Sequence, residues 1–193
     1  MNSKELKSLN VLTVDGGEKL GSLARTYVDG TEMRIVGFAF REGGSFMQVE
    51  SEPKLDTSDI HSLGPDALLL DHKESVHGAE VNERAGELQI LEEISGRSLL
   101  TEGGDSMGEV ASISFDAHSF ALTEIELSAG HFKANTTIPI DQVVIIGRDY
   151  VIVNDGDARP GEAPAKVVSI IPAGETSTNV PSVPESATVH EPV

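Results

Sequence analysis

The chain has 193 residues, and its 32 acidic side chains against 14 basic ones leave a formal net charge of −18. Such a chain repels phosphate backbones, so direct binding of nucleic acid is not expected. The absence of cysteine excludes disulfides, thiolate metal sites and a cysteine nucleophile. No apolar run is long enough for a membrane span, and the first ten residues lack the apolar segment of a secretory signal. The cytoplasm is therefore the expected location.

The most informative feature of the sequence is an internal repeat. Residues 14–21, VDGGEKLG, recur as TEGGDSMG at 101–108, a shift of 87. Further along the shift becomes 83, where residues 60–70 align with 143–153. Glycines, acids and apolar positions match in the same order in both copies, so the chain is predicted to contain one fold twice. Upstream of the Gly-Gly pairs the alignment is too weak to assign a register.

Each copy is predicted to consist of short strands. The first strand of each copy covers 20–29 or 107–116, and the second covers 32–40 or 119–127. Apolar and polar residues alternate along these segments, which is typical of strands with one buried face.

The alternation changes phase in the middle of the second strand of both copies. The change falls between Ile35 and Phe38, and again between Leu122 and Ile125, which predicts a β-bulge that both copies retain. In the first strand, the pattern near Gly21 and Gly108 indicates either a bulge or a strand start that is covered on both faces. Three aromatic residues lie at positions typical of the core, namely Phe38, Phe40 and Tyr150.

Turns rich in glycine and aspartate separate the strands, because glycine accepts positive φ without a Cβ clash. The residues assigned as structural turn positions are Asp15, Gly16, Gly17, Gly21, Gly64, Gly103, Gly104, Gly108, Gly147 and Asp149. Asp29-Gly30 and Asp116-Ala117 are predicted to form the turn between the first and second strands of the two copies.

The rest of the chain differs in composition. Only residues 82–95 have the apolar spacing of a short amphipathic helix, whereas 71–86 are polar. From residue 159 the chain is rich in Pro, Ser, Thr and Glu, so the tail is predicted to be disordered. The apolar segment 166–171 is the exception, and it either adds an edge strand to the second copy or serves as a short binding motif.

The order of these motifs resembles the PRC-barrel family. The Asp-Gly-x-x-x-Leu/Met-Gly opening and the segment IPIDQVVIIGRDYVIV at 138–153 are similar to the start and end of that domain. The family includes the cytoplasmic barrel of the photosynthetic reaction-centre H subunit and the C-terminal barrel of a bacterial ribosome maturation factor. The resemblance implies a small all-β barrel that docks on other macromolecules and has no shared catalytic residues. Neither relative's specific role is carried over, since fold alone is a weak guide to function.

We therefore expect an all-β protein of two tandem small PRC-like β-barrels with a disordered C-terminal tail. The expected divisions are a first barrel at 1–76, a linker at 77–89, a second barrel at 90–158 and the tail at 159–193.

Two segments contain residue types that bind metals. His72 and His77 lie with Asp71 and Glu74 in the linker region 71–77, but their spacing matches no metal signature. The run NDGD at 154–157 resembles the start of a calcium loop but lacks the alternating acids and the final glutamate. The Gly-Gly turns lack the lysine and helix of a phosphate loop, and no residues are arranged as a nucleophile and its base. No catalytic, cofactor or metal residue is assigned, and metal binding by the linker stays open.

The expected function is that of a non-enzymatic protein-interaction or assembly module, an adaptor. The alternatives are an accessory protein in ribosome maturation or RNA processing that acts through a ribosomal protein, and an ion-binding stress protein. Residues 1–80 carry 8 basic and 14 acidic side chains, a net −6, whereas 81–158 carry 4 and 14, a net −10. A protein partner of the second copy is therefore expected to present a basic face. Homo-oligomerisation is left open.

Overall fold

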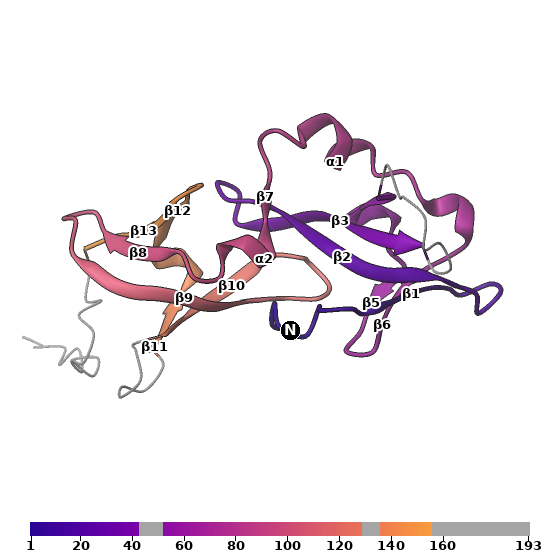
Figure 1. Ribbon diagram of the computed structural model, residues 1–193, viewed down its shortest axis with the longest axis horizontal. Coiled ribbons are helices and arrows are strands. Elements are labelled where there is room, and N and C mark those ends of the chain that lie inside the picture. The colour runs from indigo at the N-terminus through magenta and orange to yellow at the C-terminus, as the bar shows by residue number, and fades with distance from the viewer. Residues whose placement is uncertain (43–51, 129–135, 156–193) are drawn as a thin grey trace, which may run out of the picture. The chain divides into compact units, whose positions relative to one another are not determined.

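The computed structural model describes residues 1–42, 52–128 and 136–155. Strands dominate these residues and form two curled sheets, each like a half-barrel (Figure 1). The predicted all-β fold with two tandem small barrels is confirmed. Among the described residues, no helix combines the length and the apolar character that crossing a membrane requires.

The first sheet is built from the first copy of the repeat. Its strands are β1 (Asn10–Thr13), β2 (Lys19–Asp29), β3 (Arg34–Glu42), β4 (Lys54–Asp56), β5 (Ser62–Leu63) and β6 (Ala67–Leu70). They follow the order β4-β3-β2-β1-β6-β5, in which β1 and β6 run parallel and the other neighbours antiparallel.

The second sheet repeats this topology strand for strand. Its strands are β8 (Ser98–Thr101), β9 (Ser106–Phe115), β10 (Leu122–Ser128), β11 (Thr136–Pro139), β12 (Val143–Ile146) and β13 (Tyr150–Val153). Their order is β11-β10-β9-β8-β13-β12, with β8 and β13 parallel. A single 3-10 turn precedes the final hairpin in each copy, at Thr57–Asp59 and Ile140–Gln142. Val11 pairs with Gly21 as Leu99 pairs with Gly108, which supplies the register that the sequence left unassigned upstream of the Gly-Gly turns.

The predicted β-bulges are present in both copies. Val36 is the extra residue of β3 and Thr123 that of β10, so the phase changes in the sequence are explained. Leu20 and Met107 are extra residues at the starts of β2 and β9, directly before Gly21 and Gly108. Of the two interpretations of that region, the bulge is therefore the correct one.

Gly21 lies where β2 passes very close to the neighbouring strand. A Cβ added there would overlap the carbonyl group of Arg41. Gly108, its counterpart, has a φ of 127°, and a Cβ there would lie 3.0 Å from the carbonyl oxygen of Ser128. Glycine is needed at both positions because a side chain would force β2 and β3, or β9 and β10, apart.

The segment predicted as a linker contains regular structure. Helix α1 (Ala79–Arg84) packs Val81 against the first sheet, and β7 (Gln89–Ile90) pairs with β2. Helix α2 (Leu91–Ile94) follows directly. The helix predicted over 82–95 is therefore two short helices separated by a strand, because Gln89 and Ile90 use their backbone groups to extend the sheet. A single-turn 3-10 helix (Lys73–Ser75) precedes α1. The domain boundaries themselves stay a prediction.

The two copies exchange their leading segments. Ile90 of β7 pairs with Tyr27 in the first sheet, and Asn2 pairs with Ser114 in the second. These are equivalent contacts, since Tyr27 and Ser114 occupy the same position in the two copies. Each sheet is thus extended by a segment that precedes the first strand of the other copy.

The segments that lead out of the turns between the long strands also form a reciprocal contact. The Ile35 N–H donates to the Phe120 carbonyl, and the Leu122 N–H donates to the Met33 carbonyl, both at 2.8 Å. Met33 and Phe120 have positive φ, of 52° and 60°. The two copies are therefore related by an approximate two-fold axis that passes through this contact. We call the contact, formed by residues 33–35 and 120–122, the joint.

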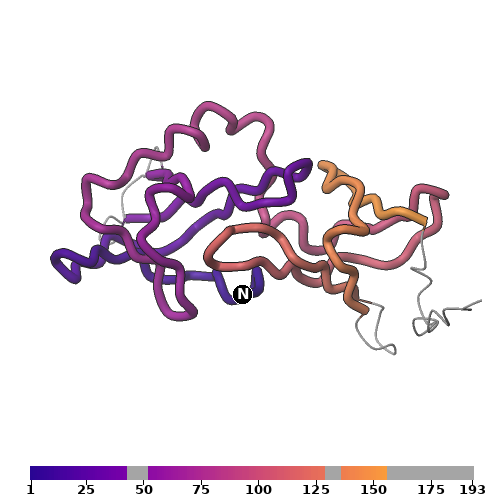
Figure 2. The backbone as a smooth tube through the Cα atoms, turned by 180° about the vertical axis from the view of Figure 1, so that it is seen from behind, coloured from indigo at the N-terminus to yellow at the C-terminus, as the bar shows by residue number. Residues whose placement is uncertain are grey.

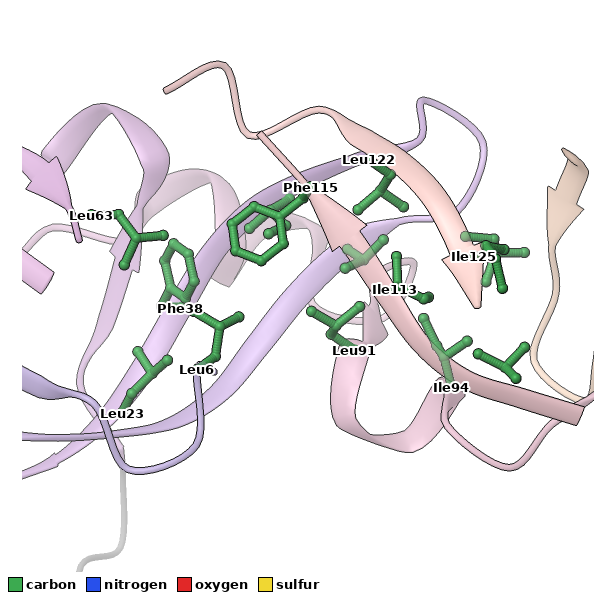
Figure 3. Close-up of a cluster of buried hydrophobic side chains, with 14 of the residues drawn as sticks. Leu6, Leu23, Phe38, Leu63, Leu91, Ile94, Ile113, Phe115, Leu122 and Ile125 are labelled. Carbon is green, nitrogen blue, oxygen red and sulfur yellow. The ribbon is translucent and has the colours of Figure 1, made fainter. Parts of the chain in front are cut away.

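A single hydrophobic cluster spans both sheets. It includes Phe38 and Leu63 from the first copy and Phe115 and Leu122 from the second, as Figure 3 shows. Phe38 and Phe40 are buried as predicted. Since the core is shared, neither copy buries its apolar residues by itself.

Candidate interaction surface

Large apolar side chains are exposed together on the β12–β13 hairpin. Val144, Ile145 and Tyr150 retain 49%, 42% and 50% of their accessible surface. Ile152 is half-buried beside them. We refer to these four residues as the hairpin patch. The expectation that Tyr150 belongs to the core is wrong.

The strand pairing explains why the hairpin patch faces outward. Ile145 pairs directly with Ile152, so both side chains lie on one face, and Tyr150 is two residues from Ile152 on that same face. The other face carries the four buried residues of the hairpin, Val143, Ile146, Val151 and Val153. Val144 is the extra residue of a bulge, which turns its side chain outward as well.

The hairpin patch lies at the edge of the second sheet. In the part of the chain that the structure describes, β12 is the last strand in the sheet order, with no strand beyond it. Asp141 and Asp149 flank the patch and are exposed. The exposed Arg148 donates to the carbonyl of Gly86 at 3.0 Å. An apolar area bordered by carboxylates therefore faces solvent here.

The equivalent hairpin of the first copy has a different surface. His61, Ser62 and Ala67 occupy the positions of Val144, Ile145 and Tyr150. The His61 ring nitrogen Nδ1 lies 2.8 Å from Asp71 Oδ1, so this face is polar. The two hairpins share their pairing but not their outward side chains, and only the second one carries an apolar patch.

The aspartates of the two long-strand turns have pKa values below the ordinary range. Burial would raise the pKa of Asp29, but the N–H groups of Glu32 and Thr31 and the Arg84 guanidinium outweigh burial and lower it. At Asp116, the N–H and hydroxyl of Ser119 and the N–H of His118 lower the pKa. Both turns are held by ionised carboxylates, and the first also has an ion pair with the Arg84 guanidinium.

The potential metal ligands of the linker do not converge. His77 Nδ1 lies 3.3 Å from Asp59 Oδ1, while the His72 carbonyl accepts the Ser75 N–H. In the ranges 1–42, 52–128 and 136–155, no three His, Asp or Glu side chains are grouped so that they could hold a metal ion. In the segment that resembles a calcium loop, Asp155 accepts the Gly103 N–H at 2.9 Å, and residues 156 and 157 lie outside the described residues.

Eight of the ten residues assigned as turn positions lie between strands, but the assignment is wrong for Gly21 and Gly108, which lie inside β2 and β9 next to the bulges. Gly17 and Gly104 have φ values of 60° and 89° in the turns before β2 and β9. The Gly64 N–H donates to the Ala67 carbonyl, and the Gly147 N–H to that of Tyr150, both at 2.9 Å. The same turns contain the other assigned residues, Asp15, Gly16, Gly103 and Asp149. These positions shape the backbone and do not form a common site. The tail, including 166–171, lies outside the described residues.

Sequence reasoning missed the hairpin patch although a signal was present. The shift of 83 aligns apolar Val144 and Ile145 with polar His61 and Ser62. A polar residue in one copy marks a position that the fold leaves in water, so an apolar residue in the other copy is exposed too. That comparison between the copies would have identified the patch.

Comparison with known families supports the resemblance. Residues 90–159 match the family model described as the PRC-barrel domain. This match covers the whole second sheet, and the first sheet has the same strand order. A search of curated proteins finds no match. Domains of this family are interaction and assembly modules and are typically not catalytic.

Proposed function

We propose that this chain, with its PRC-barrel domain at residues 90–159, is a non-enzymatic adaptor that binds a protein partner through the hairpin patch. The observation that carries the proposal is the exposure of Val144, Ile145 and Tyr150 on one hairpin. Contiguous exposed apolar side chains with a polar border are typical of protein interaction sites. The equivalent hairpin of the first copy, which has the same backbone but a polar face, shows that the fold does not require them.

The charge of the second copy favours a particular kind of partner. Residues 81–158 have a net charge of −10, and Asp141 and Asp149 border the patch. A partner with an apolar anchor surrounded by Lys or Arg complements this surface. The Ile146 N–H already donates to the Gly30 carbonyl and the Ile146 carbonyl accepts from Gln89, so this end of the β12 edge is occupied. The partner therefore packs on the outward face of the hairpin and does not extend the sheet.

The proposal is tested by quantitative affinity purification from native extract of the source organism. The bait variants are the wild type, a patch variant carrying Ile145→Ser and Tyr150→Ser, and a matched control carrying Ala67→Ser, at the position equivalent to Tyr150 on the first hairpin. A partner is expected to be recovered with the wild type and the control but at least about tenfold less with the patch variant, a loss of about 1.4 kcal/mol in binding free energy.

Two further measurements sharpen this test. Recovery of the partner should fall as salt is raised, because basic side chains contribute to the encounter. Equal recovery by all three baits, each shown to be folded by thermal melting, would overturn the assignment of the hairpin patch. Sedimentation of the partner with ribosomal subunits would favour the alternative of an accessory protein in ribosome maturation.

A further inference from the structure

The approximate two-fold axis brings each long-strand turn next to the final hairpin of the other copy, and one of these two contacts is tightly closed. The Ile146 N–H donates to the Gly30 carbonyl at 3.2 Å. A Cβ added to Gly30 would overlap the Ile146 carbonyl group. Gln89 and Arg97 seal the contact by donating to the carbonyls of Ile146 and Gly147, at 3.3 and 2.5 Å. Figures 1 and 2 both show the β2–β3 turn beside β12.

The equivalent contact on the other side is open. Ala117 takes the place of Gly30, and Leu63 takes the place of Ile146. The Cβ of Ala117 prevents the close approach that Gly30 makes, since any Cβ at that position would meet a carbonyl group. No hydrogen bond joins Ala117 to Leu63 in the described part of the chain.

A cleft of about 380 Å³ occupies the open side. Ile60, Leu63 and Phe120 supply apolar surface, and the polar lining includes Ser62, His61 and His118. The cleft is continuous with the joint between the copies, because Phe120 accepts the Ile35 N–H there. We call it the open-side cleft.

The Leu63 N–H points toward the open-side cleft. Leu63 pairs with Leu68 as Ile146 pairs with Val151, so the N–H groups of Leu63 and Ile146 have the same orientation relative to their hairpins. The Ile146 N–H points away from its hairpin and donates to the Gly30 carbonyl. A backbone donor is therefore presented at an edge where a carbonyl from another segment fits.

We infer that the open-side cleft binds a glycine-containing turn of a partner protein. The closed side is the template: a turn of sequence Asp-Gly fills the equivalent space and accepts the equivalent N–H. Glycine is required in the partner because a side chain at this point would collide with the Leu63 carbonyl, as one at Gly30 would with that of Ile146. This site lies in the first copy and across the joint, so it is separate from the hairpin patch.

Recognition in the open-side cleft depends on backbone and shape more than on charge. His61 Nδ1 lies 2.8 Å from Asp71 Oδ1, and Asp116 Oδ1 accepts the backbone N–H of His118 at 3.1 Å. Apart from these two histidines, the residues that line the cleft have no ionisable side chain, so its lining suits a neutral turn.

The inference is tested with the full chain by NMR titration of its backbone amide signals. The probe is the capped hexapeptide Tyr-Val-Asp-Gly-Thr-Glu, which copies residues 27–32, and the matched control peptide has Ala in place of Gly. The glycine peptide is expected to shift the amide signals of Leu63 and its neighbours at millimolar concentration. The alanine peptide should bind at least tenfold more weakly.

Three variants test whether the peptide binds in the open-side cleft. Ala117→Gly should lose peptide binding, because the chain's own turn can then close onto Leu63. Ser62→Trp, at an exposed position, should block the cleft without disturbing the core. Tyr150→Ser should bind the peptide as the wild type does, which separates this site from the hairpin patch. The inference would be overturned if the peptide shifted no amide signals or shifted only signals outside the open-side cleft. Undiminished binding by both Ala117→Gly and Ser62→Trp would overturn it as well.

Discussion

The two copies of the repeat have the same backbone but different surfaces. Strand order, bulges and the joint are reproduced position for position, down to the positive φ of Met33 and Phe120. The differences that concern binding lie on the outward face of the final hairpin and at Gly30 and Ala117. Backbone hydrogen bonding and core packing therefore constrain the positions that the copies share, whereas the solvent-facing positions are free to acquire different binding properties.

The copies also depend on each other. Each sheet is extended by a segment from the other copy, and one hydrophobic cluster serves both. A duplicated chain is thus not simply two domains joined by a linker. Its two halves resemble the subunits of a symmetric dimer joined covalently.

The largest effect on stability is expected in the core that the two copies share. Phe38→Ala removes a fully buried ring that contacts the ring of Phe120 across the joint, at 6.1 Å between centroids. The free energy of unfolding should fall by about 3–5 kcal/mol. Urea unfolding followed by NMR should show the amide signals of both sheets disappearing in one transition. A second sheet that stays folded after the first has melted would show that the copies are independent.

The next largest effect on stability is expected at Gly21, where the fold requires glycine, in comparison with Gly64, where a side chain fits. Gly21→Ala should destabilise the protein by about 2–3 kcal/mol because the new Cβ overlaps the carbonyl group of Arg41. Gly64→Ala is the matched control, since its Cβ would lie 3.7 Å from the nearest atom, the carbonyl oxygen of Ala67. Its unfolding free energy should change by less than about 1 kcal/mol. Urea denaturation at neutral pH measures both, and equal effects would contradict the close approach at Gly21.

A smaller effect distinguishes the two long-strand turns. Asp29→Asn removes the ion pair with Arg84 and should reduce the free energy of unfolding at pH 7 by about 1–3 kcal/mol. Asp116→Asn should cost less, because Asp116 is exposed and its hydrogen bonds are to Ser119 and His118.

The lowered pKa of Asp29 predicts how the free energy of unfolding depends on pH. The folded state lowers the pKa of Asp29, so its stabilising contribution is full above the usual value of 3.8 and is lost as the pH falls through the lower folded value. The difference between the wild type and Asp29→Asn in urea unfolding should therefore shrink between pH 5 and pH 2. A difference that grows toward low pH would contradict this assignment.

The smallest effect on stability is expected at the hairpin patch. Ile145→Ser and Tyr150→Ser alter exposed side chains, so each should change the free energy of unfolding by no more than about 0.5 kcal/mol. The thermal melting curve checks this directly. A large loss of stability would mean that these residues support the fold and are not reserved for a partner.

Much of the fold could be predicted because its causes are local. The Gly-Gly turns, the alternation of apolar residues and its change of phase each follow from neighbouring residues, and the duplication provides two independent instances of each pattern. Tyr150 was misplaced because one strand position has two possible faces, and the bulge at Val144 alters which face is buried. The short strand β7 was missed because Gln89 and Ile90 acquire their structure from β2, which is distant in the sequence.

By itself, then, the sequence determined that two copies of an all-β barrel are present, where their turns and bulges fall, and that the second copy is the more acidic. These properties depend on backbone preferences and on residue composition. Only the tertiary structure decided that the copies exchange their leading segments, share one core and differ in the contacts made by Gly30 and Ala117. Those contacts join residues far apart in the chain, and the one at Gly30 is so close that a Cβ there would overlap the Ile146 carbonyl group.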